Sequence, residues 1–480
     1  MRAHARFAHD PGLLYPQNVN LSSILACLVI ATCHVTAATI VERGPWSGAL
    51  TPTSAVVKAK IVLNFPNLRL AVSRNADLSR ALYVAVEKGE GHIVTFHVRN
   101  LEPNQYYYYA VDAGGMDLEH RGRFRTYPAG PTSFTFAFAS CARTASSHPV
   151  FETILRNNPL FFMNVGDLHY LDIKENRRDL FRAGYDLVLG SRTQSTLYRY
   201  VPFVYMWDDH DFGGNNSNSE ADVHEAAQLT YQEYVPHYPL IAGSGNVPVY
   251  HAFTVGRVRF ILTDLRSART RITEPDDVRK TMLGIPQKQW LKSELLAAKG
   301  NYPLIFWVST VPWLGGTGTN YYPLPATHSG YAHHRNLPPM PISQGRVFTQ
   351  GANRPPPEDH WSLFSTERRE LADFVKANSI AGLCIIHGDA HMLAADDGSN
   401  ADYATGGGAP IPVIAAAPLD QGASIKGGPY SQGIYKPPHG EGCFGLVRVL
   451  EQGDRIRVIY SGRNHLNAEK VSLQFAVPAK

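Results

Sequence analysis

The chain has 480 residues, of which 44% are hydrophobic and 18% are charged. This composition is that of a globular protein with at least one sizeable core, and it excludes an intrinsically disordered chain. The 45 lysines and arginines and the 41 aspartates and glutamates leave a net charge of +4, with no run of basic residues. So small a charge over this length excludes an electrostatic nucleic-acid-binding surface.

Residues 1–37 have the pattern of a signal peptide. Arg2 and Arg6 precede an apolar stretch over residues 21–35, and small residues follow it. The apolar stretch is too short to span a bilayer, and the small residues suit a cleavage site. We therefore expect a secreted or periplasmic protein with no transmembrane helix in its mature chain. Two alternatives are an uncleaved membrane anchor and a lipid attached at Cys33.

Cysteine usage gives a first indication of a metal. Removal of residues 1–37 would leave Cys141, Cys384 and Cys443. An odd number of cysteines in an exported protein leaves at least one thiol outside any disulfide. A thiolate that binds a metal is one role for such a residue.

Residues 39–128 predict a small β-sandwich of the fibronectin type III or immunoglobulin kind. The segment 101–111 reads Leu-Glu-Pro-Asn-Gln-Tyr-Tyr-Tyr-Tyr-Ala-Val and resembles the strand-and-corner signature of a fibronectin module. Residues 127–131 predict the linker that follows. Short apolar or alternating runs recur between turns, which is typical of such sandwiches, over residues 55–63, 68–72, 81–86, 92–98, 106–112 and 122–126.

Residues 132–480 predict a second, layered domain of the α/β or α+β class, with sheets flanked by helices. Its apolar runs predict strands that are covered on both faces. These runs cover residues 134–140, 160–166, 203–207, 258–263, 304–310 and 380–388. Segments with the termini and periodicity of helices cover residues 286–298 and 366–378. A C-terminal hairpin is predicted over residues 445–450 and 455–460.

The segment 312–359 is long and has prolines and glycines spread through it. In a compact domain a connection of this length is usually functional or disordered. We expect it to form a lid or a wall over the active site.

Nearly every apolar run of the second domain ends in residues that can bind a metal. The endings are Cys141, Asp167 to Tyr170, Asp208 to Asp211, Asp264 to Arg266, and Asp389 to His391. Ligands of open α/β sheets bind at the carboxyl ends of the strands, so we expect these side chains to meet at one edge of the sheet. A single such aspartate would be interpreted as a helix cap. Five endings of this kind favour a metal centre.

The residue types indicate which metals the centre would hold. Carboxylate, imidazole, thiolate and phenolate ligands together can hold two cations that share a bridging oxygen. Two such cations can deprotonate a water and stabilise both sides of an in-line displacement at phosphorus. A thiolate and a phenolate favour a redox-capable iron, whereas the remaining oxygen ligands suit a harder ion such as calcium.

Five short motifs carry a specific resemblance. They are Ser-Cys at 140–141, Gly-Asp-x-x-Tyr at 166–170, Trp-Asp-Asp-His-Asp-Phe-Gly-x-Asn at 207–215, Asp-x-Arg at 264–266 and Gly-Asp-x-His at 388–391. In residue types and order they resemble the PhoD-type alkaline phosphatases, a branch of the calcineurin-like metallophosphoesterases. The resemblance covers residues 140–391, and the string at 207–215 is its most specific part.

This resemblance implies a set of metal ligands. Asp167 would bridge two ions, and the other ligands would belong to one ion each. Those of a ferric ion would be Cys141, Tyr170 and His391, and those of a neighbouring ion, expected to be calcium, would be Asp209 and Asp389. From the residues alone, Cys141 could instead be a buried core thiol, and Tyr170 a packed aromatic at a strand end.

Three further residues would act on the substrate. His210 resembles the histidine that assists the phosphoryl group or protonates the leaving oxygen. Asn215 and Arg266 resemble residues that contact metal or phosphate, although Arg266 could also form an ordinary salt bridge.

The function implied by the resemblance is that of a secreted phosphoric monoester hydrolase, in which a metal-bound hydroxide attacks phosphorus in line. The alternative is a phosphodiesterase that acts on lipids, teichoic acids or nucleotides with the same site. A third hypothesis is a binding or adhesion protein with a decayed site, which the intact ligand set disfavours. We expect a monomer whose substrate is a small-molecule or lipid phosphoester.

Overall fold

The computed structural model describes residues 40–63, 65–88, 92–315 and 359–479. The predicted signal peptide lies outside the described residues, and so does the predicted lid except for its two ends. Thr39–Lys480 form one compact unit. Among the described helices, none has both the length and the apolar character that crossing a membrane requires.

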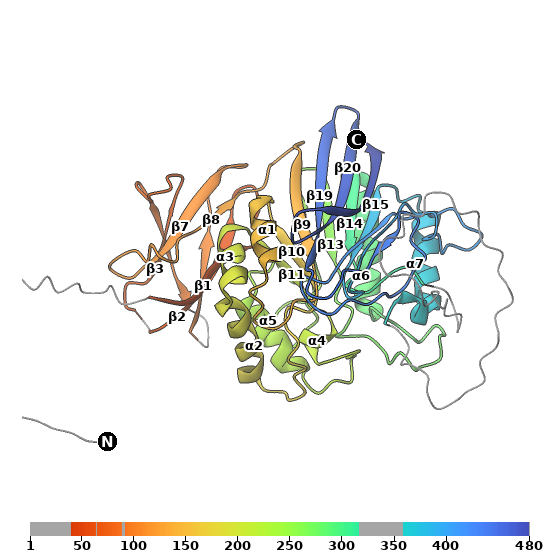
Figure 1. Cartoon of the computed structure of the whole chain (residues 1–480), viewed down its shortest axis with the longest axis horizontal. Helices are drawn as coiled ribbons and strands as arrows, with labels where there is room; N and C mark the ends of the chain where they lie inside the picture. The colour runs from red at the N-terminus through yellow and green to blue at the C-terminus, as the bar shows by residue number, and fades with distance from the viewer. Residues whose placement is uncertain (1–39, 64, 89–91, 316–358, 480) are drawn as a thin grey trace, which may run out of the picture. The chain divides into compact units, whose positions relative to one another are not determined.

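Two β-sheets form the centre of this unit (Figure 1). The six-stranded sheet has the order β11 (Phe203–Met206), β10 (Phe162–Val165), β9 (Phe134–Ala139), β19 (Cys443–Gln452), β20 (Arg455–Asn464) and β21 (Glu469–Pro478). The seven-stranded sheet has the order β12 (His251–Val255), β13 (Val258–Leu262), β14 (Leu304–Val308), β15 (Leu383–His387), β17 (Val413–Ala416), β16 (Leu393–Asp396) and β18 (Ile434–Tyr435). Strands β9, β10 and β11 run parallel to one another, as do β13, β14, β15 and β17.

The two sheets pack face to face through aromatic side chains. Phe136 of the six-stranded sheet contacts Phe260 and Phe306 of the other sheet, with ring centroids 5.3 and 5.4 Å apart. Both contacts are edge-to-face, an arrangement that aromatic rings favour. The apolar runs of the sequence therefore form strands buried on both faces, one face against the other sheet.

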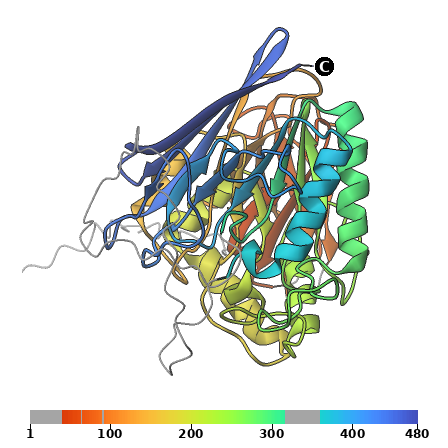
Figure 2. The same ribbon diagram turned by 90° about the vertical axis from the view of Figure 1, so that its right-hand side faces the viewer.

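The outer face of the seven-stranded sheet packs against two helices. In β14, Phe306 points into the space between the sheets, whereas Ile305 and Trp307 belong to a second core together with Leu291 and Leu371. This alternation follows from the two-residue period of a strand. The helices that cover this face (Figure 2, green and cyan) are α6 (Ile285–Asn301) and α7 (Ser365–Ala377).

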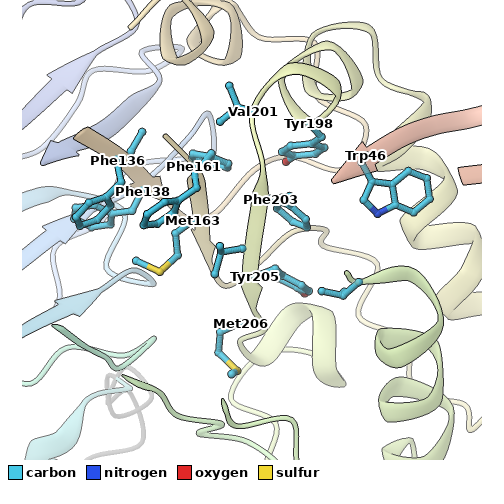
Figure 3. Close-up of a cluster of buried hydrophobic side chains, with 14 of the residues drawn as sticks. Trp46, Phe136, Phe138, Phe161, Met163, Tyr198, Val201, Phe203, Tyr205 and Met206 are labelled. Carbon is cyan, nitrogen blue, oxygen red and sulfur yellow. The ribbon is translucent and has the colours of Figure 1, made fainter. Parts of the chain in front are cut away.

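Another group of helices covers the outer face of the six-stranded sheet. Tyr198 stacks on Phe162 with ring centroids 6.3 Å apart, and Tyr231 stacks on Tyr205 at 5.5 Å. Figure 3 shows Phe203 and Tyr205 on the side of β11 that faces these helices. The order of layers is helices, sheet, sheet, helices. The helices of this group are α1 (Pro149–Arg156), α2 (Arg178–Gly190), α3 (Arg192–Tyr200) and α5 (His224–Tyr234).

The strands before residue 126 form two four-stranded antiparallel sheets. One has the order β1 (Val41–Gly48), β2 (Ala55–Ile61), β6 (Ile93–Val98) and β5 (Glu87–Lys88), and the other β4 (Leu82–Ala85), β3 (Arg69–Ser73), β7 (Tyr106–Asp112) and β8 (Gly122–Arg125). The Tyr107 hydroxyl accepts a hydrogen bond from the backbone N–H of Glu102 at 2.9 Å, as in a tyrosine corner. Trp46 donates to the Tyr234 carbonyl of α5, so these sheets pack on the helices. The fibronectin-like module and its boundary stay predictions.

A buried histidine gives the fold a measurable pH dependence. His251 of β12 is 1% exposed, and its Nδ1 lies 2.9 Å from the Val249 carbonyl oxygen. Burial lowers the pKa of His251 from 6.5 to about 4. Because the folded pKa is the lower one, the contribution of His251 to stability is complete above pH 6.5 and is lost as the pH falls toward 4.

We expect His251→Asn, which can still donate to Val249, to reduce this acid sensitivity. Between pH 7 and pH 4.5 the free energy of unfolding should fall by up to about 3 kcal/mol less in the variant than in the wild type. Urea unfolding at several pH values measures the difference, and other buried histidines contribute equally to both proteins. Parallel pH curves for the two proteins would contradict the assignment.

Candidate metal centre

The predicted ligands come from both central sheets, which corrects the expectation of a single sheet edge. Cys141, Asp167 and Asp209 follow strands β9, β10 and β11 of the six-stranded sheet. Asp389 and His391 follow β15 of the seven-stranded sheet. Because the two sheets pack face to face, the carboxyl ends of these strands meet at one end of the unit. An apolar run predicts a strand covered on both faces, but it does not predict which sheet the strand joins.

The structure brings these side chains together in three overlapping clusters. Within each cluster, one candidate ligand atom per residue lies within 4.8 Å of the others. Asp167 and Asp209 each belong to two clusters, as a residue shared between two ions would. The clusters are Cys141 with Asp167 and His391, Asp167 with Asp209 and His210, and Asp208 with Asp209 and Asp389.

The clustered carboxylates have the properties of a cation site. Oδ2 of Asp208 and Oδ2 of Asp389 are buried and have no hydrogen-bond partner among the described residues. Burial, followed by the charges of Asp209, Asp211 and Asp389, raises the pKa of Asp167 well above its usual range. Buried carboxylates of like charge are costly unless a cation compensates them. The residues present therefore fit bound metal ions.

The backbone at four candidate ligands is strained. The φ angles are 62° at Cys141, 54° at Asp167, 53° at Asp389 and 48° at His391. Residues with a Cβ rarely adopt this left-handed region, and such strain concentrates at functional sites. The loops are also tightly packed, since a Cβ on Gly388 would clash with the Ser140 side chain. The tertiary structure therefore holds the ligand loops in conformations that the local sequence disfavours.

A thiol, a phenol and an imidazole surround one side of Asp167. The Tyr170 hydroxyl donates to Oδ2 of Asp167 at 2.7 Å and lies 3.0 Å from Nε2 of His391. The Cys141 thiol lies 3.4 Å from the same oxygen. Burial, with the charge of Asp167, raises the pKa of both Cys141 and Tyr170 well above their usual ranges. Both groups are therefore protonated without a cation, and metal binding would have to displace their protons.

His391 is oriented for metal binding. Its Nδ1 is hydrogen-bonded to the carbonyl oxygen of Gly422, which leaves Nε2 facing Tyr170. Burial, followed by the charge of Lys426, lowers the pKa of His391 to about 4. A neutral imidazole whose other nitrogen is bound to a carbonyl is the usual form of a histidine ligand.

Within the Asp208–Asp211 string, Asp211 binds backbone groups, whereas Asp208, Asp209 and His210 all belong to the metal clusters. Asp208 precedes the short helix α4 (Asp209–Phe212), and Oδ1 of Asp211 accepts the Asp208 backbone N–H at 2.7 Å. Oδ2 of Asp211 accepts the Leu168 N–H at 2.8 Å. Asp211 is therefore the N3 residue of a capping box whose N-cap residue is Asp208. Asp209 and His210, which lie between the two, belong to the metal clusters.

Arg266 lies behind the centre. Its side chain is fully buried, and it donates to Asp208 at 2.7 Å and to Asp359 at 2.7 Å. Burial raises the pKa of Asp209, but the charge of Arg266, with those of His210 and Lys426, outweighs this effect, so the pKa is lowered. In this structure the charge of Arg266 therefore favours the ionised form of Asp209, and its side chain exposes no surface to a substrate.

Asn215 is exposed, and no hydrogen bond joins its side chain to the clusters in the part of the chain that is described. The next residue has the contact instead, since the backbone N–H of Asn216 donates to Oδ2 of Asp209 at 2.7 Å. A contact made by a backbone N–H does not depend on the type of side chain, so it cannot be predicted from the residue at that position.

His210 has a partner that sequence reasoning missed. Its Nδ1 lies 2.6 Å from Oδ1 of Asp172, and its ring centroid lies 4.2 Å from that of Tyr170. The His210 side chain is 18% exposed, so it reaches the surface of the centre. The carboxylate and the tyrosine ring together fix the orientation of the imidazole.

Lys426 was also missed, and its Nζ lies 2.6 Å from Oδ1 of Asp389. Asp172 and Lys426 both lie in loops rather than directly at the end of an apolar run. The only sequence signal for Asp172 is its position five residues after Asp167. For Lys426 we find no local signal.

Comparisons with known proteins place the candidate ligands within a region of known family. A sequence model of the PhoD-like phosphatase family matches residues 136–426, which include all the residues of the three clusters. A curated relative, alkaline phosphatase D of Bacillus subtilis (strain 168), is 23% identical over 391 residues, which are 72% of this chain and 60% of that protein. The match thus spans less than two thirds of that relative.

Two solved structures share the fold. A structure of PhoD superposes with a TM-score of 0.68 at 17% identity, covering 90% of this chain and 89% of the other. A purple acid phosphatase from yellow lupin (Lupinus luteus) seeds gives a TM-score of 0.53 at 10% identity, covering 91% of this chain and 75% of the other. At these identities the likeness concerns the fold alone.

Proposed function

Because the chain belongs to the PhoD-like phosphatase family, we propose that it is a metal-dependent phosphoester hydrolase that acts on phosphomonoesters. The observation that carries the proposal is the buried group of four aspartates with a thiol, a phenol and an imidazole at the strand ends. Such a donor set suits a pair of cations. That the protein is exported is proposed from the sequence of residues 1–37.

We propose two sets of metal ligands that share Asp167. The first, for a ferric ion, adds Cys141, Tyr170 and His391. The second, for calcium, adds Asp209 and Asp389. Two cations bound there would activate a water for in-line attack and neutralise the charge of the phosphoryl oxygens.

The chain itself supplies the proton for the leaving group. Asp172 binds Nδ1 of His210 at 2.6 Å and thereby favours a proton on that nitrogen. Nε2 is then the atom of the ring that can serve the substrate. A proton given from Nε2 to the leaving oxygen would restore the neutral imidazole that Asp172 and Tyr170 hold in place.

The direct test combines catalysis with elemental analysis of protein purified after export. We expect hydrolysis of p-nitrophenyl phosphate to depend on bound metal, to stop on chelation and to return when metal is restored. Bis(p-nitrophenyl) phosphate serves as the diester. A faster reaction with the diester would favour the phosphodiesterase alternative, and no reaction with either ester in metal-loaded protein would refute the proposal.

The role of Cys141 can be tested through metal content. The three cysteines of the described residues are all free and buried. Cys141→Ser should lose most of the iron, because a hydroxyl at this position is a poorer ligand for it than a thiolate. Cys384→Ala is the matched control, since Cys384 lies in β15 and belongs to none of the clusters. Equal iron content in both variants, or a disulfide at Cys141, would exclude the thiolate ligand.

A further inference from the structure

One lysine ammonium lies among the carboxylates of the centre. Lys426 belongs to the loop between β17 and β18, and its Nζ lies 2.6 Å from Oδ1 of Asp389. The Lys426 side chain is 22% exposed, whereas that of Asp389 is 3% exposed. The Lys426 side chain is therefore partly exposed, while its ammonium contacts a buried candidate ligand.

The contact with Lys426 leaves Asp389 able to bind a metal. Lys426 occupies Oδ1, whereas Oδ2 is buried and has no partner among the described residues. The carboxylate can therefore hold a cation through Oδ2 and the lysine through Oδ1. Arg266 differs, because it is fully buried between Asp208 and Asp359. Of these two side chains, only that of Lys426 has exposed surface.

The loop that carries Lys426 is fixed to the ligand loops. Ser424 donates its backbone N–H to the His391 carbonyl at 3.3 Å and its hydroxyl to the Ala390 carbonyl at 3.1 Å. Gly427 has a φ of 70°, and a Cβ there would clash with the Leu314 carbonyl oxygen. The backbone around Lys426 is thus held from both sides, and its ammonium is preorganised.

A lysine with its ordinary pKa carries a positive charge at neutral and mildly alkaline pH. Nζ of Lys426 lies 2.6 Å from Oδ1 of Asp389, so this charge lies directly beside the proposed ligands.

We propose that Lys426 binds the phosphoryl group of the substrate and makes the site selective for the dianion of a phosphomonoester over the monoanion of a phosphodiester. This proposal rests on the hydrolase function proposed above. A fixed ammonium attracts a second negative charge in addition to the first, so its loss weakens dianion binding more than monoanion binding. A lysine ammonium is a compact charge on a flexible side chain, so it can bind a phosphoryl oxygen without the fixed bidentate geometry of an arginine.

The test uses Lys426→Met, with Lys426→Arg as the conservative variant. Lys292→Met is the matched control, because Lys292 is 25% exposed and also forms a 2.6 Å ion pair, but with Glu370 on the helical face. We expect Lys426→Met to lower kcat/KM for p-nitrophenyl phosphate by roughly 10- to 100-fold, mainly through KM. The diester should lose less than about 3-fold, and Arg should restore most of the monoester activity.

Two further readouts separate substrate binding from a structural role. The dissociation constant for inorganic phosphate, measured by calorimetry, should rise by about the same factor as KM, and metal content should stay unchanged. Equal losses on both esters together with metal loss would mean that Lys426 only holds Asp389, and unchanged phosphate binding would equally overturn the proposal. If the wild type hydrolyses neither ester, the hydrolase function fails, and the phosphate titration still decides whether Lys426 binds phosphate.

Discussion

Asp167→Asn is expected to abolish hydrolysis, with kcat lower by roughly 10³-fold or more. Asp167 belongs to two clusters, and its Oδ2 faces both the Tyr170 hydroxyl at 2.7 Å and the Cys141 thiol at 3.4 Å. A neutral amide removes the charge that two cations would share, and its NH₂ group would face donors. The measurement is kcat together with metal content after reconstitution.

The same substitution should leave the fold intact. In metal-free protein, burial and then the charges of the neighbouring carboxylates raise the pKa of Asp167, so its ionised form is disfavoured. Its neutralisation should therefore leave the metal-free variant at least as stable as the metal-free wild type. Near-wild-type turnover in a variant that retains its metals would refute the bridging role.

Asp211→Asn is the matched control within the same region. Asp211 is also buried, but its two oxygens accept the backbone N–H groups of Asp208 and Leu168. An asparagine can accept only one of these bonds, so we expect unfolding to become easier by about 1–3 kcal/mol. The two substitutions should thus have opposite signatures: lost turnover with a stable fold for Asp167, and lost stability for Asp211.

The sequence predicted the candidate ligands that lie directly after a strand. Asp167, Asp209 and Asp389 each follow a short apolar strand. The end of such a strand can be located in the sequence, because the apolar residues stop there. The helices predicted over residues 286–298 and 366–378 correspond to α6 and α7 for a similar reason, since helical periodicity and a proline or glycine at the ends are local signals. Properties of this kind can be predicted without tertiary contacts.

What could not be predicted depends on long-range packing. The strands that precede the candidate ligands belong to two different sheets. Which sheet a strand joins depends on contacts between distant residues, such as that of Phe136 with Phe306, and cannot be predicted from one apolar segment of the sequence. Arg266 is a similar case. Its motif predicted a contact with metal or phosphate, whereas its guanidinium is hydrogen-bonded to Asp359, which lies 93 residues away in the sequence. Lys426 contacts Asp389, 37 residues away, from a loop in which Gly427 packs its backbone directly against the Leu314 carbonyl.

His210→Ala should have an effect that depends on the leaving group. If Nε2 of His210 protonates the leaving oxygen, an alkyl phosphate should lose roughly 10²- to 10⁴-fold in kcat, because an alkoxide leaves poorly without a proton. A nitrophenyl phosphate should lose less than about 10-fold, since nitrophenolate is stable as an anion. Asp172→Asn, which removes the carboxylate at 2.6 Å from Nδ1, should show the same dependence with a smaller loss.

Metal content decides between this role and that of a ligand, because His210 also lies in a cluster with Asp167 and Asp209. We expect His210→Ala and Asp172→Asn to keep their metals, and Asp209→Ala to lose metal and both activities together. Loss of metal in His210→Ala would make this histidine a ligand. Equal losses on both substrates with metal retained would make it a residue that positions the phosphoryl group. Only retained metal with a selective loss on the alkyl ester identifies His210 as the proton donor, with Asp172 acting through it.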